Sequence, residues 1–72
     1  MQSANITLSD DKRVTMREPK VRDIRAVSSI ASEEEKEIAL ISNLTGMMEE
    51  EIDDLSLADY AKLQDALSGF MF

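Results

Sequence analysis

The sequence predicts a small α+β fold that is mainly helical, with an N-terminal β-hairpin followed by three helices and a short connector helix. Two periodic patterns predict it. Apolar and polar residues alternate in two short segments near the N-terminus, and from residue 21 onward apolar residues recur at spacings of three and four. Because 72 residues suit one domain at most, we expect a single small domain. In it, residues 1–4 are disordered, 5–17 form the hairpin and 19–70 form the helical part.

The hairpin is expected from Ile-Thr-Leu at residues 6–8 and Val-Thr-Met at residues 14–16. The five polar residues between these segments match the length of a hairpin loop. Alternate side chains of a strand point to the same face, so one apolar face should contain Ile6, Leu8, Val14 and Met16. An isolated two-stranded hairpin is marginal in water. We therefore expect this face to pack on helices or on another chain.

The first two helices are expected on either side of a serine-containing break. Pro19 suits the first turn of a helix. The apolar stripe of that helix should be Val21, Ile24, Val27 and Ala31, with the charged residues 22, 23 and 25 outside it. Ser32 and Glu35 have the spacing of a capping box and begin the second helix. Gly46 is its expected left-handed stop. Its buried stripe should be Ile38, Ile41 and Leu44, widened by Ala39 and Leu40.

The last helix is expected to begin after Ser56, which forms a weaker capping pair with Asp59, and to end at Gly69. Its apolar face should contain Leu57, Tyr60, Ala61, Leu63, Ala66, Leu67 and Phe70. Between Gly46 and Ser56 there is room for one short connector helix. The residues expected to point inward from this connector are Met48, Ile52 and Leu55.

The composition argues against most chemistry. The chain has no cysteine and no histidine, so a disulfide framework, a Cys/His zinc site and thiol or imidazole catalysis are excluded. The acidic run at residues 49–54 has no internal glycine and does not fit a calcium loop. A net charge of −7 opposes nucleic-acid binding. No run approaches the ~18 apolar residues of a membrane span, and the first five residues lack the pattern of a secretory signal. We expect a cytoplasmic protein without enzymatic activity, cofactor or metal.

The remaining signal is association. So short a chain without disulfides or metal is usually marginal alone, so we expect self-association or a partner. Residues 1–31 carry six basic and four acidic side chains, whereas residues 32–72 carry two basic and eleven acidic ones. We expect the basic side chains to solvate the hairpin and the outer face of the first helix; the alternative is that this asymmetry promotes head-to-tail contacts between copies. Methionine adapts to irregular partners, and the C-terminus is an apolar tail. The candidate partner-binding residues are therefore Met47, Met48, Phe70, Met71 and Phe72.

Two segments resemble a known family. They are "VTMREPKVRDIRAV" at residues 14–27 and "EEEKEIALISNLTGMMEEEIDDLSLADYAKLQDALSGF" at residues 33–70. Both are similar to the small tail assembly chaperones of contractile-tailed phages of the P2-like and Mu-like kinds. The most specific part is the succession Leu-Thr-Gly, Glu-Glu-Ile-Asp, Leu, Asp-Tyr, Leu in residues 44–63, preceded by Arg-Glu-Pro at residues 17–19.

This resemblance implies a non-enzymatic protein of the bacterial host cytoplasm. Such a protein coats the tape-measure protein, is displaced by the tail tube protein and is absent from the finished virion. The tape-measure protein, the tail tube protein and further copies of the chain are thus the expected partners. Two other functions stay open at this point: a small structural component of the tail, and an acidic adaptor or inhibitor of a host protein.

Overall fold

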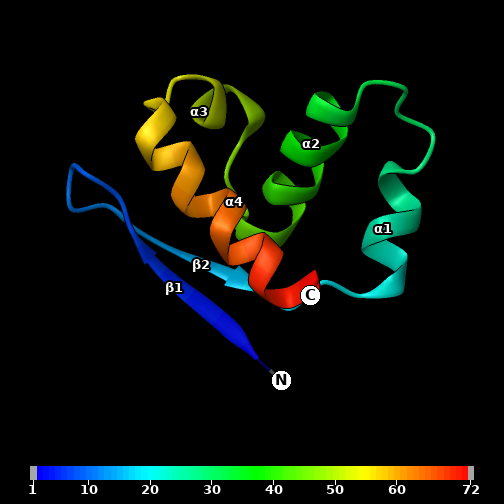
Figure 1. The fold of residues 1–72 in the computed structure, drawn as a ribbon, viewed down its shortest axis with the longest axis horizontal. Helices are drawn as coiled ribbons and strands as arrows, with labels where there is room; N and C mark the ends of the chain where they lie inside the picture. The colour runs from blue at the N-terminus through cyan, green and yellow to red at the C-terminus, as the bar shows by residue number, and fades with distance from the viewer. Residues whose placement is uncertain (1, 72) are drawn as a thin grey trace.

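The computed structural model describes residues 2–71, in which two strands precede four helices (Figure 1). The strands are β1 (Ser3–Thr7) and β2 (Arg13–Arg17). The helices are α1 (Val21–Val27), α2 (Glu33–Thr45), α3 (Glu49–Asp53) and α4 (Leu57–Met71). In Figure 1, α2 lies between α1 and α4, and α3 lies at the end of the molecule where α4 begins. The predicted class, a hairpin followed by three helices and a connector, is confirmed.

The hairpin supplies one buried face, as its alternating pattern predicts. β1 and β2 pair antiparallel, with Ile6 opposite Val14. The four expected side chains are all buried: Ile6, Leu8, Val14 and Met16. β1 begins at Ser3, earlier than the expected start at residue 5. Ser3 and Ala4 are part of the ladder, where Ser3 pairs with Arg17, so these two residues do not belong to the disordered segment expected from the sequence.

The core lies where the hairpin, α2 and α4 meet. Its most completely buried side chains are Met16 of β2, Ile41 of α2 and Leu63 of α4. Around them pack the other buried apolar residues: Ile6, Leu8, Val14, Val27, Leu40, Leu44, Met47, Ile52 and Leu67. Fully burying a side chain of this size contributes about 1.5–3 kcal/mol. The hairpin face is thus stabilised by helices of its own chain.

The apolar stripe predicted for the first helix is wrong except at one position. Val27 is buried, but Val21 is 76% exposed and Ile24 is 38% exposed. The helix also ends at Val27, so Ala31 lies beyond it and is exposed. α1 therefore turns most of its apolar side chains toward solvent.

The side of α1 that faces the protein is held by a carboxylate. Asp23 is buried and accepts two hydrogen bonds of 2.8 Å from the Arg17 guanidinium of β2. It also accepts a 2.8 Å bond from the backbone N–H of Lys20, just before the helix begins. A paired and hydrogen-bonded charge can replace an apolar contact, and this pairing rotates Asp23 inward and Val21 outward.

α2 follows the sequence prediction closely. The Ser32 hydroxyl accepts a 3.3 Å hydrogen bond from the backbone N–H of Glu35, so the helix begins where the capping pattern places it. Gly46 ends the helix in the left-handed conformation, with φ of 79°, which is accessible to glycine without a steric cost. The expected stripe is buried at Leu40, Ile41 and Leu44, and half-buried at Ile38 and Ala39.

α4 differs from the prediction at both ends. Ser56 caps it by accepting a 3.2 Å hydrogen bond from the backbone N–H of Asp59, as expected. Leu57, however, is 87% exposed, and Ala61 is exposed as well. The helix continues through Gly69 to Met71, because a glycine ends a helix only where the chain turns left-handed, and Gly69 has no such φ.

Candidate functional site

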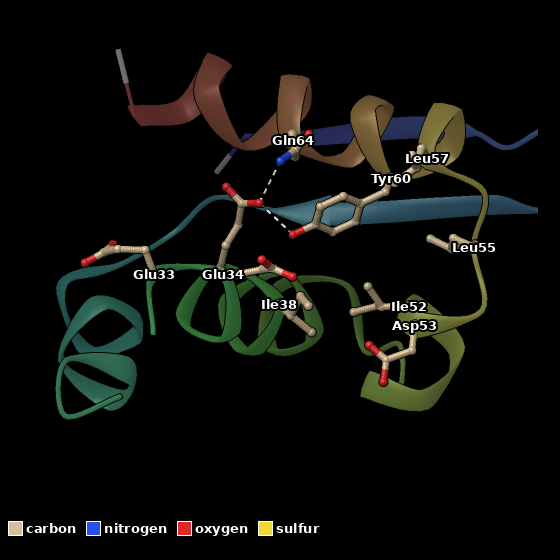
Figure 2. A pocket seen from close by; sticks show the side chains of 10 residues that line it. Glu33, Glu34, Ile38, Ile52, Asp53, Leu55, Leu57, Tyr60 and Gln64 are labelled. Carbon is tan, nitrogen blue, oxygen red and sulfur yellow. Dashed lines mark hydrogen bonds between the residues drawn. The ribbon is translucent and has the colours of Figure 1, made fainter. Parts of the chain in front are cut away.

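α2 and α4 diverge, and their side chains line a groove with a volume of about 670 Å³ that is closed at one end by α3. Its floor is apolar and consists of Ile38, Ile52, Leu55 and Tyr60. Figure 2 shows Tyr60 reaching from α4 toward α2, with Ile38 and Ile52 beneath it. Leu57 lines the mouth of the groove and is 87% exposed. The groove thus presents apolar surface that no other part of the described chain covers.

The rim of the groove is acidic. Glu33, Glu34 and Glu37 come from the first turns of α2, and Asp53 comes from α3. Residues three and four apart share one side of a helix, so the three glutamates line the same edge. Glu33 also forms a 3.4 Å ion pair with Lys36, but its side chain is 88% exposed, so that pair contributes little. Glu34 and Asp53 take part in no ion pair within residues 2–71.

Glu37 connects the two walls of the groove. Its Oε1 accepts a 2.6 Å hydrogen bond from the Tyr60 hydroxyl and a 2.8 Å bond from the Gln64 amide of α4, both drawn in Figure 2. Partial burial and the bond to Glu37 raise the pKa of the Tyr60 hydroxyl. Tyr60 therefore remains a neutral hydrogen-bond donor at physiological pH, which suits a structural link rather than proton transfer.

The acidic side chains of the rim are of a type that can also serve as metal ligands. Within residues 2–71, no three His, Cys, Asp or Glu side chains come together as a metal site would require. In the same part of the chain, no helix combines the length and apolar character needed to cross a bilayer. The groove is suited to bind apolar surface that carries basic groups beside it.

The structure separates the candidate partner-binding residues from one another. Met47 is only 6% exposed and belongs to the core. The Ser42 hydroxyl donates to its carbonyl oxygen at 2.6 Å, and its own N–H donates to the Thr45 hydroxyl at 3.1 Å. These bonds fold the chain back after Gly46 and turn Met47 inward. In the folded protein Met47 does not present a surface for a partner, contrary to the expectation.

Of the other candidates, two are exposed. Met48 is 61% exposed, although it was expected to point inward, and Met71 is 46% exposed. Phe70 is half-buried and packs against the core, and Phe72 lies outside the described residues. α3 and the C-terminal end of α4 are at opposite ends of the molecule in Figure 1. Met48 and Met71 therefore do not form one surface.

The groove was not expected from the sequence. The sequence assigns Glu35 only to the capping box of the second helix, and Tyr60 only to the apolar face of the last helix. Tyr60 and Glu37 are 23 positions apart in the chain, and no local sequence pattern predicts a hydrogen bond between residues so far apart. The one available signal was Glu37 itself, which lies directly beside the apolar stripe of α2 in the sequence.

The fold defines a small, mainly helical α+β protein with an open groove between α2 and α4. Residues 6–71 match the family model for phage tail assembly chaperone proteins, E, or 41 or 14. Since the match spans nearly the whole chain, this protein belongs to the phage tail assembly chaperone family, and the resemblance noted in the sequence is confirmed. No curated protein matches the chain significantly, and neither does any solved structure.

Proposed function

We propose that this protein is a non-enzymatic chaperone that coats the tape-measure protein in the cytoplasm of the bacterial host before the tail tube polymerises, and that it is absent from the finished virion. Membership of the family supports a role in tail assembly. The observation that carries the binding step is the groove of about 670 Å³ with an apolar floor and an acidic rim. A long apolar helical protein needs such a cover until its own partners surround it.

The groove suits one face of an amphipathic helix. Such helices bind grooves through apolar anchors spaced three and four residues apart, and the floor formed around Ile38 and Tyr60 offers apolar surface of that kind. Basic residues beside the anchors would meet the carboxylates of Glu34 and Asp53. Complementary charge contributes more to orientation and encounter rate than to affinity. Moderate affinity fits a coat that the tail tube protein later displaces.

Met48 and Met71 form a second candidate contact with the tape-measure protein, because both are exposed. Phe70 is less suited to this role since it packs on the core. Replacing Phe70 would alter stability and binding together. Met48 and Met71 can be replaced without opening the core.

The groove is tested by co-expression with a helical fragment of the tape-measure protein from the same tail-gene cluster. Leu57→Ser should reduce the co-purified fragment several-fold, because it removes the most exposed apolar side chain that lines the groove. Leu57→Met keeps an apolar group there and should retain the fragment. Circular dichroism checks that both variants keep their helicity.

The methionines are tested in the same assay with the double variant Met48→Ser/Met71→Ser. If this variant loses the fragment while Leu57→Ser retains it, the methionines carry the contact and the groove does not. If both variants retain it, neither surface binds the tape-measure protein. Mass spectrometry of purified tails checks the remaining part of the proposal: stoichiometric amounts of this polypeptide in finished tails would make it a structural component.

A further inference from the structure

α1 presents an exposed surface that is both apolar and basic. Val21 is 76% exposed and Ile24 is 38% exposed. Arg22 and Arg25 are also exposed. At 100° per residue, Val21, Arg22 and Arg25 lie on the side of the helix opposite Asp23 and Val27, which face the protein, and Ile24 lies at the border between the two sides. We call Val21, Arg22, Ile24 and Arg25 the α1 face.

Within residues 2–71, the two arginines of the α1 face form no ion pair with a carboxylate. Within residues 2–71, the ion pairs join Lys12 to Glu51, Arg17 to Asp23, Lys36 to Glu33 and Lys62 to Asp59. Arg22 and Arg25 appear in none of them. The α1 face thus combines two exposed apolar side chains with two arginines that form no ion pair within the described part of the chain, a composition suited to contact with another surface.

The α2–α4 groove has the complementary composition. Its apolar floor matches Val21 and Ile24, and its acidic rim, with Glu34 and Asp53 outside any described ion pair, matches the two arginines. A chain cannot place its own α1 there. α1 lies on the side of α2 that is turned away from α4 and the groove, as Figures 1 and 2 both show. The α1 face can meet a groove only in another copy.

We propose that the α1 face of one copy docks in the α2–α4 groove of a second copy, so that the protein associates head to tail. A pair of copies then keeps one free groove at one end and one free α1 face at the other. Such a heterologous contact builds a ring if its rotation closes, and an open chain if it does not. Because the tape-measure protein is proposed to bind the same groove, α1 covers that groove while no client is present.

The contact should be weak. A standard interface buries about 800 Å² on each partner, roughly a sixth of the 4981 Å² surface of this chain, and a helix of seven residues offers less than that. We therefore expect association that depends on concentration and weakens as salt is added, because exposed charges are screened. A weakly held α1 can also be displaced by a client.

The proposal is tested by sedimentation equilibrium of the full chain without any client, over a wide concentration range. Arg25→Glu and Glu34→Lys should each raise the dissociation constant of self-association about tenfold, since each places like charges in the contact. Mixing the two variants should restore association, because the acidic α1 face then meets a basic groove. Arg13→Glu and Glu50→Lys carry the same charge changes on exposed residues outside both surfaces and should leave association unchanged.

Three results would overturn the proposal. They are a wild-type chain that stays monomeric at the highest concentration, control variants as disruptive as Arg25→Glu, and a mixture that does not recover association. Since no client is present in the sedimentation experiment, its result does not depend on whether the tape-measure protein binds the groove. Loss of client binding by Leu57→Ser with intact charge complementation would separate the two roles of the groove.

Discussion

At the scale of single residues, carboxylates fasten the hairpin to the helices. The backbone N–H and the hydroxyl of Ser9 donate to the two oxygens of Asp59 at 3.0 and 2.8 Å. These bonds, the hydroxyl of Ser9 foremost, hold the pKa of Asp59 below its usual value. The bidentate bonds from Arg17 likewise hold the pKa of Asp23 well below its usual range. A hairpin of two strands has little stability alone, so these links fix its position on the core.

Asp59→Asn should lower the free energy of unfolding at neutral pH, because it weakens the charge-assisted bonds with Ser9. The stability that comes from a lowered pKa is present above the pKa of the unfolded chain, ~3.9 for aspartate, and is lost as pH falls through the lower folded value. The difference between wild type and variant should therefore be full at pH 7 and shrink below about pH 4. Urea unfolding at pH 7 and pH 3 measures it.

Asp65→Asn is the matched control for this change, because Asp65 is exposed on the same helix and forms none of the described hydrogen bonds. It should leave unfolding nearly unchanged at both pH values. A wild-type advantage that stays constant down to pH 3 would contradict the role given to the Asp59 carboxylate.

The two adjacent methionines should respond very differently to truncation. Met47→Ala removes a buried core side chain and should cost about 2–5 kcal/mol of unfolding free energy. Met48→Ala removes a side chain that is 61% exposed and should change stability by no more than about 0.5 kcal/mol. Chemical denaturation of the two variants distinguishes them. Equal losses would mean that the turn after α2 does not bury Met47.

At the scale of elements, helix ends are set by local chemistry and helix faces by tertiary contacts. Ser32 and Ser56 cap α2 and α4. α3 begins without such a side chain; instead the carboxylate of Glu51 accepts a 3.0 Å hydrogen bond from the backbone N–H of Met48. α1 is short and is oriented by Asp23. These capping interactions join residues that are three or four positions apart, so most of them can be predicted from the sequence.

The two glycines should respond in opposite directions to alanine. Gly46 has φ of 79°, and a Cβ added there meets nothing within 4 Å. The cost of Gly46→Ala is therefore the backbone strain alone, about 1–2 kcal/mol. Gly69 is helical and also has open space around it, so Gly69→Ala should stabilise the protein by up to about 1 kcal/mol. Thermal unfolding measures both, and a destabilising Gly69→Ala would contradict a helix that continues to Met71.

At the scale of the whole molecule, a small core leaves two complementary surfaces exposed. The groove lies between α2 and α4, and the α1 face lies on the other side of α2. The proposed head-to-tail contact between copies brings these two surfaces together.

The melting temperature should rise with protein concentration, because an association that requires the folded state stabilises it by mass action. In a domain of this size about 1 kcal/mol shifts the melting temperature by roughly 4–8 °C. Arg25→Glu should shift this concentration dependence to about tenfold higher protein concentrations, without lowering the melting temperature of the dilute protein. Calorimetry at several concentrations tests this. A melting temperature that is independent of concentration in the wild type would contradict the association.

The sequence by itself determined the order of the elements, the buried face of the hairpin, the caps at Ser32 and Ser56 and the stop at Gly46. Each of these features depends on residues close together in the chain. There the spacing of apolar residues and the steric preferences of the backbone allow few other local structures. The family resemblance also came from the sequence, because it depends on the order and spacing of short motifs along the chain.

Only the tertiary structure decided which side of α1 is buried, which methionine enters the core and where the groove lies. These features depend on pairs far apart in the chain, such as Ser9 with Asp59, 50 positions apart, and Glu37 with Tyr60, 23 apart. A buried carboxylate with good partners takes the place of an apolar residue, so Asp23 faced inward where hydrophobic periodicity alone placed Val21. The divergence of α2 from α4 depends on how both helices pack on the hairpin, and no local sequence pattern predicts that packing.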